Sequence, residues 1–291
     1  MIKHETHFNM DAYVLENEYL IVKILKDFGG KIASIYHKEL DYEVLFQPTK
    51  NSYDIPKLGD AFSKYDTSGI DEMLPTIDEC YYPNSYKKLN DHGDIWAQKW
   101  RYEEDGDALI SKVRCDSIKL DLERKIQLDQ EEIKIDYKLY NPTEQELHYL
   151  WAFHGLMNFD ESTELEFFTD SEIENVINDK DYEFDYLKLG EYPDGQSYKF
   201  YFKDEINDGR VNILHKDKNV SITYAYDTDI NKYLGVWITK GGFKGEYNLA
   251  IEPSSGYYDS LELAYKNDKV SKIDSKETKK WKLNLEIKKW R

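Results

Sequence analysis

Apolar and polar residues alternate along several stretches of this chain. A period of two is the pattern of a β-strand that has one face on a core and the other toward water. Helical periodicity is weak, and residues 171–184 form the one candidate helix. The apolar members of the alternating stretches are Ile118, Leu120 and Leu122; Ile133, Ile135, Tyr137 and Leu139; Val220, Ile222, Tyr224 and Tyr226; and Trp281, Leu283, Leu285 and Ile287.

Turn-forming residues such as Gly29-Gly30 and Asn141-Pro142 separate these stretches. Many strands joined by short turns indicate an all-β sandwich or barrel. No Gly-, Ser- or Pro-rich linker and no long internal repeat divides the sequence, so we expect one domain over residues 1–291. Residues 48–100 are less regular, and we expect them to form long loops over a sheet, where function usually lies.

Composition narrows the class of protein. Hydrophobic residues make up 40% and aromatic residues 15% of the 291 residues, which is enough for a large core. A formal charge of −18 disfavours nucleic acids and anionic membranes as partners. The sequence lacks an apolar run of about 20 residues and an apolar N-terminal segment, so we expect no membrane span and a cytoplasmic protein. Cys80 and Cys115 are too few for a disulfide framework or a structural zinc site.

Three segments interrupt the strand pattern and combine polar with aromatic residues. The first is GIDEMLPTIDEC with NDHGDIWAQKW, the second is LWAFHGLMNF, and the third is VWITKGG with IEPSSGYYDSL. They contain His92, His154 and Glu252, each near a tryptophan in its segment. Each has an ordinary explanation taken alone: a solvated loop histidine, a structural strand histidine and a carboxylate in an ion pair. His154 has the same strand parity as Ala152 and the opposite parity to Trp151.

Taken together, these residues favour a sugar ligand. Aromatic faces stack on the apolar faces of sugars, and carboxylates and imidazoles hydrogen-bond hydroxyl groups. The five arginines do not cluster in the three segments, and there is no GxxxxGK[ST] loop, so a neutral carbohydrate fits better than a phosphate ester. A HExxH zinc motif and a GxSxG serine elbow are also absent. A glycosidase that pairs Asp71 or Glu72 with Glu252 remains open at this point.

The motifs FGGKIASIYHK, DHGDIW, WAFHGL and IEPSSGYYDSL occur in the order seen in the galactose mutarotase-like superfamily, the aldose 1-epimerases and their relatives. The chain resembles a divergent branch of this family over residues 28–264. The resemblance implies a β-supersandwich of large, mostly antiparallel sheets with a sugar in an open concave cleft. It also implies that His154 is the general acid, that Glu252 is the general base, and that His92 holds the sugar near its ring oxygen.

The implied reaction interconverts the α and β anomers of a free sugar. One group removes the O1 proton while another protonates the ring oxygen, and the opened sugar then closes on the other face. This isomerase chemistry requires no metal or organic cofactor, and the expected partner is a small carbohydrate bound to a monomer or homodimer. The expected substrate-binding residues are Asp71, Glu72, Trp96, Trp151, Trp237 and, for the sugar-binding aspartate of the family, Asp194.

The sequence also departs from the family pattern. Archetypal members carry an arginine before the first histidine, whereas this chain has Asp71 and Glu72 there. Two acids would favour a neutral or cationic sugar, such as an amino sugar, and would repel a sugar phosphate or a uronate. A non-catalytic carbohydrate-binding protein and a glycosidase-like enzyme on the same fold are the alternatives. His154 and Glu252 on opposite sides of a cleft, one sugar ring apart, would favour the epimerase, and a Glu252 ion pair facing away would favour the binding protein.

Overall fold

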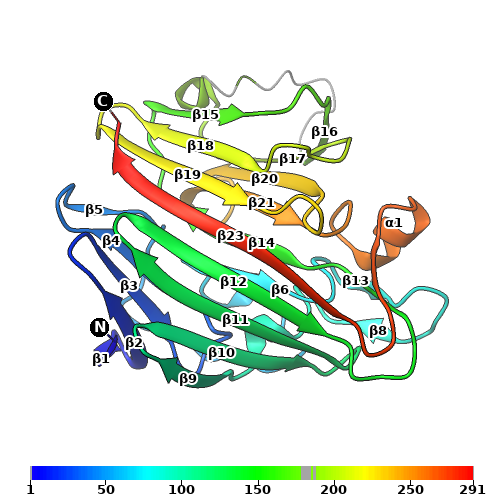
Figure 1. Ribbon diagram of the computed structural model, residues 1–291. Helices are drawn as coiled ribbons and strands as arrows, with labels where there is room; N and C mark the ends of the chain where they lie inside the picture. The colour runs from blue at the N-terminus through cyan, green and yellow to red at the C-terminus, as the bar shows by residue number, and fades with distance from the viewer. Residues whose placement is uncertain (1, 178–184, 186–187, 291) are drawn as a thin grey trace.

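Two large antiparallel β-sheets contain most of the strands, as the ribbon diagram shows (Figure 1). The computed structural model describes residues 2–177, 185 and 188–290. One sheet has 11 strands and the other has eight, and every pairing between named strands that the structure records is antiparallel. The prediction of an all-β fold built from large antiparallel sheets is therefore confirmed.

The 11-stranded sheet has the order β1-β2-β3-β4-β6-β14-β21-β20-β17-β16, with β5 paired to β4. Its strands are β1 (Ile2–His7), β2 (Met10–Glu16), β3 (Leu20–Leu25), β4 (Ile32–His37), β5 (Tyr42–Glu43), β6 (Ile70–Met73), β14 (Ala152–Met157), β16 (Ile173–Ile177), β17 (Gln196–Phe202), β20 (Tyr233–Lys240) and β21 (Tyr247–Ser254).

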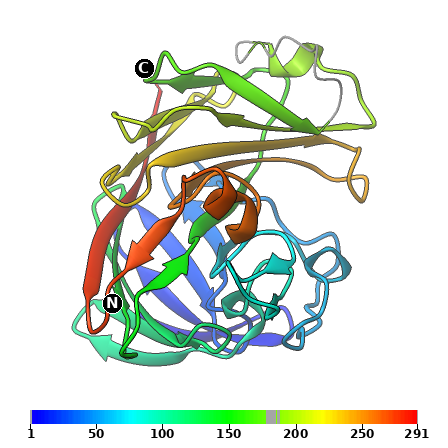
Figure 2. The same cartoon turned by 90° about the vertical axis from the view of Figure 1, so that its right-hand side faces the viewer.

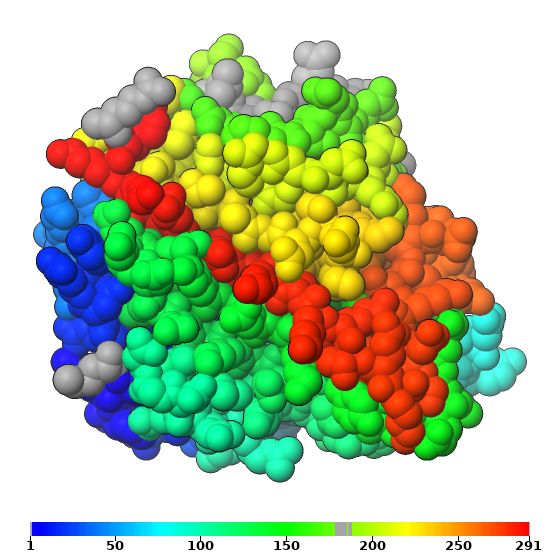
Figure 3. Space-filling view, viewed as in Figure 1, coloured from blue at the N-terminus to red at the C-terminus, as the bar shows by residue number. Residues whose placement is uncertain are grey.

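The eight-stranded sheet has the order β15-β18-β19-β23-β12-β11-β10-β9. The space-filling view shows β23 as a red band between the yellow strands and the green strands of this sheet (Figure 3). Its strands are β9 (Arg101–Asp105), β10 (Ala108–Cys115), β11 (Leu120–Asp129), β12 (Glu132–Tyr140), β15 (Thr163–Phe167), β18 (Arg210–His215), β19 (Val220–Tyr226) and β23 (Thr278–Lys289).

The remaining elements gather largely at one end of the two sheets, beside the loops of residues 48–100 (Figure 2). The described helices are all short, and none is long and apolar enough to cross a membrane. These elements are the pairs β13 (Leu147–Tyr149) with β22 (Ser271–Ile273) and β7 (Cys80–Tyr81) with β8 (Lys88–Leu89), the α-helix α1 (Leu261–Lys266), and the 3-10 helices η1 (Phe62–Lys64), η2 (Ile95–Ala97) and η3 (Leu189–Glu191).

Strands that are distant in sequence lie next to each other in both sheets. In the larger sheet β14 lies between β6 and β21, and in the smaller sheet β23 lies between β19 and β12. Each sheet thus combines strands from distant parts of the chain. This interleaving of the described strands agrees with the expectation of one domain over residues 1–291.

The main core lies between the two sheets, and the alternating stretches of the sequence supply it. Every apolar residue at the predicted inward positions of β12, β19 and β23 is buried. Trp151 from the larger sheet contacts Tyr137 and Trp281 from the smaller one, with ring centroids 4.9 and 5.1 Å away. This contact fixes which face of β14 points inward: Trp151 and Phe153 face the core, so His154 faces the other way.

The prediction of a helix over residues 171–184 is wrong where it can be tested. Residues Ile173–Ile177 form β16, which pairs with β17 at the edge of the larger sheet. Residues 178–184 lie outside the described residues. The only α-helix in the described part of the chain is α1, whose N-cap Ser260 accepts a hydrogen bond from the backbone N–H of Leu263.

Candidate active site

A cavity of about 380 Å³ lies on the face of the larger sheet that points away from the smaller sheet. Strands β14, β17, β20 and β21 supply its floor, and the loops of residues 62–67, 77–78 and 91–92 supply part of its wall. Three residues predicted from separate segments of the sequence meet here: His92, His154 and Glu252.

His154 and Glu252 come from neighbouring strands. The pairing of Ala152 with Ser254 and of Gly155 with Ile251 places them opposite each other in the β14–β21 ladder. Directly opposed residues of an antiparallel pair point to the same face, so both side chains reach the cavity. The distance from His154 Nε2 to Glu252 Oε1 is 3.7 Å.

This arrangement differs from the one expected of an epimerase on the basis of the sequence. The expectation was an acid and a base on opposite sides of a cleft, one sugar ring apart. The structure instead holds His154 and Glu252 side by side on the cavity floor. Glu252 does make an ion pair, with Lys199, but within the cavity wall rather than facing away from it.

Glu252 is a buried carboxylate with capacity left for a ligand. It is 1% exposed, and neither carboxylate oxygen accepts a hydrogen bond of good geometry from the described residues. Burial raises its pKa, and the charge of Lys199, 3.3 Å from Oε2, opposes that rise.

His154 is buried too, and its Nδ1 has no hydrogen-bond partner among the described residues. Burial lowers the pKa of His154 well below the usual value for histidine, and the nearby charges of His92 and Lys199 lower it further. Burial therefore opposes protonation of the His154 imidazole, whose ring nitrogens can each exchange a hydrogen bond with a ligand.

Lys199 and Asp259 join this pair, and Lys199 is not among the site residues expected from the sequence. Lys199 Nζ lies 2.8 Å from Asp259 Oδ1, and Tyr201 donates a hydrogen bond to the same carboxylate. Burial alone would lower the pKa of Lys199, but the charges of Asp259 and Glu252 outweigh burial and raise it, so Lys199 stays an ammonium. Gly235 makes room for Tyr201, because a Cβ at this position would lie 2.7 Å from the tyrosine ring.

The loop that carries His92 is held by backbone geometry and by stacking. His92 itself has φ +58°, and Gly93 follows with φ +71°. A Cβ on Gly93 would lie 2.2 Å from the carbonyl oxygen of Leu74, so only glycine fits there. The ring of His92 stacks on Phe62 at a centroid distance of 4.0 Å and lies 6.1 Å from the ring of His154.

Asp91 holds the His92 ring at its Nδ1 edge. His92 Nδ1 lies 2.7 Å from Asp91 Oδ1. Burial would raise the pKa of Asp91, but the hydrogen bond and charge of His92 outweigh burial and lower it. The contact orients His92, whose Nε2 has no hydrogen-bond partner among the described residues.

Trp237 provides an aromatic surface in the cavity. Its ring is partly exposed, and its Nε1 donates to Asn248 Oδ1 at 3.2 Å. Asn248 in turn donates to Glu246, which also accepts from the hydroxyl of Thr67. This chain of contacts ties β20 and β21 to the loop of residues 62–67.

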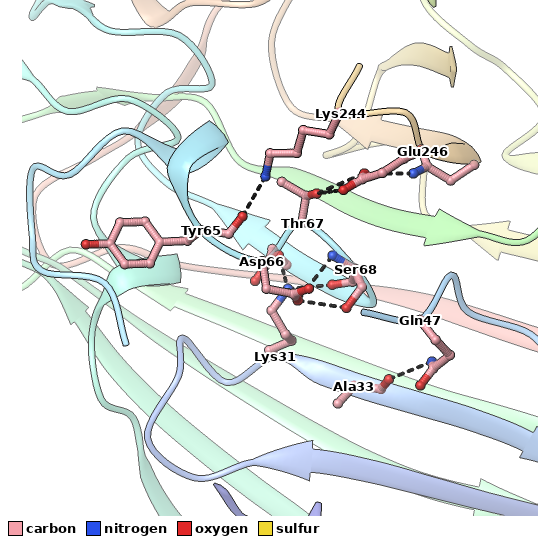
Figure 4. Close-up of polar contacts among 11 residues, drawn as sticks. Lys31, Ala33, Gln47, Tyr65, Asp66, Thr67, Ser68, Lys244 and Glu246 are labelled. Atoms are coloured by element: carbon pink, nitrogen blue, oxygen red, sulfur yellow. Dashed lines mark hydrogen bonds and ion pairs between the residues drawn. The ribbon is translucent and has the colours of Figure 1, made fainter. Parts of the chain in front are cut away.

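Asp71 and Glu72 do not line the cavity, and each carries a buried counter-ion. Asp71 Oδ2 lies 2.6 Å from Lys31 Nζ; burial raises the pKa of Asp71 to about 6, and Lys31 limits that rise. Lys31 also reaches Asp66 and the carbonyl of Ser68, so it anchors the segment beside the cavity (Figure 4).

Glu72 faces the core between the sheets, where Arg124 Nη1 lies 2.7 Å from Oε1. Trp151 Nε1 donates to its Oε2 at 3.2 Å. Because Lys31 and Arg124 neutralise the two acids, the expectation that Asp71 and Glu72 repel an anionic sugar loses its basis.

Two of the three expected tryptophans and Asp194 also lie outside the cavity lining. Trp151 is buried in the core, and Trp96 is buried beneath the His92 loop, where its Nε1 donates to the carbonyl of Asp91. The side chain of Asp194 is 73% exposed and lies 3.6 Å from Lys240. Of the expected substrate-binding residues, only Trp237 lines the cavity.

Solved structures resemble this chain in fold, whereas comparisons of its sequence found no match. No protein-family model matches the chain, and no curated protein matches it. A candidate aldose 1-epimerase from Escherichia coli K12 is 13% identical with a TM-score of 0.72, over 96% of this chain and 99% of the other. A galactose mutarotase-like protein from Clostridium acetobutylicum is 15% identical with a TM-score of 0.72, over 99% and 98%. The protein Slr1438 from Synechocystis sp. PCC 6803 is 15% identical with a TM-score of 0.75, over 99% and 100%.

These matches extend over nearly the full length of the chains compared. Their sequence identities of 13–15% are low, so the matches are evidence for a shared fold only. They agree with the resemblance that the ordered motifs of the sequence suggested. The chain therefore has the galactose mutarotase-like fold.

Proposed function

We propose that this protein is an aldose 1-epimerase-like isomerase that interconverts the α and β anomers of a free sugar. The observation that carries the proposal is the pair of His154 and Glu252, 3.7 Å apart on the floor of a cavity that the partly exposed Trp237 also lines. The fold that the chain shares with candidate aldose 1-epimerases agrees with it.

The side-by-side arrangement suits the chemistry of a hemiacetal. The hydroxyl oxygen O1 and the ring oxygen of a pyranose are both bonded to C1, so they lie closer together than two hydrogen-bonded atoms do. An acid and a base that act on these two oxygens must therefore approach one carbon from the same region.

In the proposed reaction Glu252 accepts the proton of the O1 hydroxyl while protonated His154 donates its Nε2 proton to the ring oxygen. The C1–O5 bond breaks, and C1 becomes an aldehyde carbon. Rotation about the C1–C2 bond then presents the other face of the aldehyde to the O5 hydroxyl. Ring closure reverses both proton transfers and returns Glu252 and His154 to their starting states, so no net proton is consumed.

The other cavity residues have supporting roles in this proposal. His92, held by Asp91 and Phe62, offers its Nε2 to an oxygen near C1. The face of Trp237 packs against the apolar face of the sugar ring. Lys199 opposes the protonation of Glu252, because a cation 3.3 Å from a carboxylate stabilises the charged form.

The pKa directions predict a bell-shaped dependence of the rate on pH. The reaction needs a carboxylate at Glu252 and an imidazolium at His154, whereas burial raises the pKa of the first and lowers that of the second. The rate should fall in acid as Glu252 gains a proton and in base as His154 loses one. A rate that still rises at pH 9 would contradict this assignment.

The direct test is anomer interconversion, followed by polarimetry or exchange NMR on a panel of free hexoses, pentoses and amino sugars. The wild-type protein should accelerate at least one sugar, and Glu252→Gln should lose about 10²–10⁴-fold, the range typical of a positioned acid or base. The exposed Glu144, paired with Lys276, supplies a matched control: Glu144→Gln should keep the full rate.

The same experiment separates the alternatives. Saturable sugar binding to both the wild-type protein and Glu252→Gln, without acceleration by either, would identify a non-catalytic carbohydrate-binding protein. Release of a sugar from an aryl glycoside would identify a glycosidase-like enzyme. Full activity of Glu252→Gln would remove Glu252 from the role of base.

A further inference from the structure

The cavity lining carries more negative than positive charge. Lys199 is the only lysine or arginine among the lining residues of the described chain, and two carboxylates, Glu252 and Asp259, already share it. Asp91 is paired with His92. The carboxylates that line the cavity are Asp78, Asp91, Glu246, Glu252 and Asp259.

Glu246 differs from the paired carboxylates in its partners. It is 8% exposed, and its oxygens accept hydrogen bonds from Thr67 Oγ1 at 3.2 and 3.1 Å and from Asn248 Nδ2 at 3.3 Å. All of these donors are uncharged, and no Lys, Arg or His of the described residues lies within ion-pair distance. A buried carboxylate without a counter-ion is costly, and it attracts a ligand that brings a donor or a positive charge.

Burial raises the pKa of Glu246 and the charge of the nearby Lys244 opposes that rise, but the two side chains do not form an ion pair. The close-up shows that the two side chains turn to different partners on the segment of residues 65–68 (Figure 4). Lys244 Nζ donates to the backbone carbonyl of Tyr65 at 2.7 Å, while Glu246 is held by Thr67. Lys31, below the same segment, is engaged by Asp66 and Asp71.

The position of Glu246 along the cavity indicates which part of a sugar it meets. Glu246, Asn248 and Glu252 have the same parity on β21 and the residue before it, so they form a row on one face. Asn248 and Glu252 are four residues, or about 13 Å, apart along the strand. Trp237 pairs with Ala250 between them. A ring that lies on Trp237 with C1 at Glu252 therefore directs its far side toward Asn248, whose Nδ2 donates to Glu246 at 3.3 Å.

We propose that Glu246 is a specificity-determining residue that receives a hydroxyl or ammonium donor on the side of the sugar ring remote from C1. The site then accepts neutral and amino sugars and rejects sugars that carry an anionic group at that end. This inference rests on the proposed function for the placement of C1, and it depends on residues other than Asp71 and Glu72.

The test compares four sugars that differ only at C6: glucose, 6-amino-6-deoxyglucose, 6-deoxyglucose and glucuronate. For the wild-type protein kcat/KM for anomer interconversion should be highest for the amino sugar and the neutral sugar, and lowest for glucuronate. In Glu246→Gln, kcat/KM for the amino sugar should fall about 10- to 100-fold, the range of a charge-assisted hydrogen bond, while the relative rate with glucuronate should rise.

Two further variants separate charge from structure. Thr67→Val removes the hydroxyl donor but keeps the carboxylate, so it should weaken binding of all four sugars and still reject glucuronate. Glu144→Gln removes one exposed charge elsewhere and should leave the order of the sugars unchanged. If Glu246→Gln does not fold, the proposal is still tested by the Thr67→Val variant and by the order of kcat/KM for the four sugars in the wild-type protein.

Outcomes for this inference and for the proposed function are distinguishable. Acceleration of glucose and glucuronate with equal kcat/KM, or a uniform change of all four sugars in Glu246→Gln, would overturn the role of Glu246 and leave the epimerase proposal intact. Calorimetric binding in the expected order without any acceleration would support Glu246 and overturn the epimerase. No binding of any of the four sugars would overturn the inference.

Discussion

Replacement of Lys199 by methionine is the perturbation whose outcome the structure determines most directly. The side chain is 11% exposed and lies between two carboxylates, with Nζ 2.8 Å from Asp259 and 3.3 Å from Glu252. Methionine has a similar length and no charge. The variant Lys199→Met therefore leaves two buried carboxylates beside each other without their cation.

The two contacts set the scale of the effect. At an effective dielectric constant of about 20, a pair at 3.3 Å is worth about 5 kcal/mol of Coulomb energy and a pair at 2.8 Å about 6 kcal/mol. Burial of the ammonium offsets several kcal/mol of this attraction, so the pairs themselves contribute much less than the sum. Loss of the cation from carboxylates that stay buried is expected to cost about 3–5 kcal/mol of unfolding free energy.

The cost should depend on pH with a definite sign. Burial already raises the pKa of Glu252 and Lys199 opposes that rise, so without Lys199 the folded-state pKa of Glu252 rises further above its unfolded value and the folded state binds more protons than the unfolded state. Stability then falls as pH rises through the carboxyl range. The deficit of Lys199→Met relative to the wild-type protein should be largest at pH 8 and smaller at pH 5.

Urea unfolding of the wild-type protein, Lys199→Met and Lys199→Arg at pH 5 and pH 8 measures this directly. The arginine variant keeps the charge and should lose less than the methionine variant at pH 8. A loss below about 1 kcal/mol for Lys199→Met at pH 8, or an equal loss at both pH values, would refute the reasoning from buried charge.

Three other changes have definite expected outcomes. Arg124→Met should lower the free energy of unfolding by about 3–5 kcal/mol, since it leaves Glu72 without a cation inside the core, and a urea titration that finds no loss would contradict the ion pair. Trp237→Ala should weaken sugar binding about tenfold while Trp237→Phe keeps most of it, and calorimetric titration with an accepted sugar checks this. Gly93→Ala should lower the melting temperature by several degrees, because its Cβ would lie 2.2 Å from the Leu74 carbonyl oxygen; an unchanged melting temperature in calorimetry would count against that constraint.

The sequence predicted the layered architecture well, because it depends on a local and repeated signal. The period-two stretches became β11, β12, β19 and β23, and their apolar residues face the core. Strand parity also separated His154 from Trp151: His154 on β14 lines the cavity, whereas Trp151, the residue before β14, packs against Trp281 in the core. Residues 171–184 were misread because the spacing of Ile173, Val176 and Ile177 also fits one turn of a helix.

The lining of the cavity was harder to predict, since it depends on pairing between distant residues. Asp71 and Glu72 lie in a motif-rich segment, but their cations are Lys31 and Arg124, 40 and 52 residues away. A local pattern does not reveal such partners. Lys199 did carry a signal: it stands between Tyr198 and Phe200 in a run of aromatic residues, and a lysine there is buried only if a carboxylate accompanies it.

The interleaved order of the strands has a consequence for how the protein folds. The ladder between β14 and β21 joins residues about a hundred positions apart, as Gly155 with Ile251, and β12 pairs with β23 across a similar or greater distance. Chains whose pairings are this distant in sequence fold slowly, because loop closure precedes the contacts that stabilise it. The pair of His154 and Glu252 cannot assemble until β21 has been synthesised, so a sugar cannot assist the early stages of folding. Until that point the central strands of the larger sheet have an unpaired edge, and this is the stage at which aggregation competes with folding.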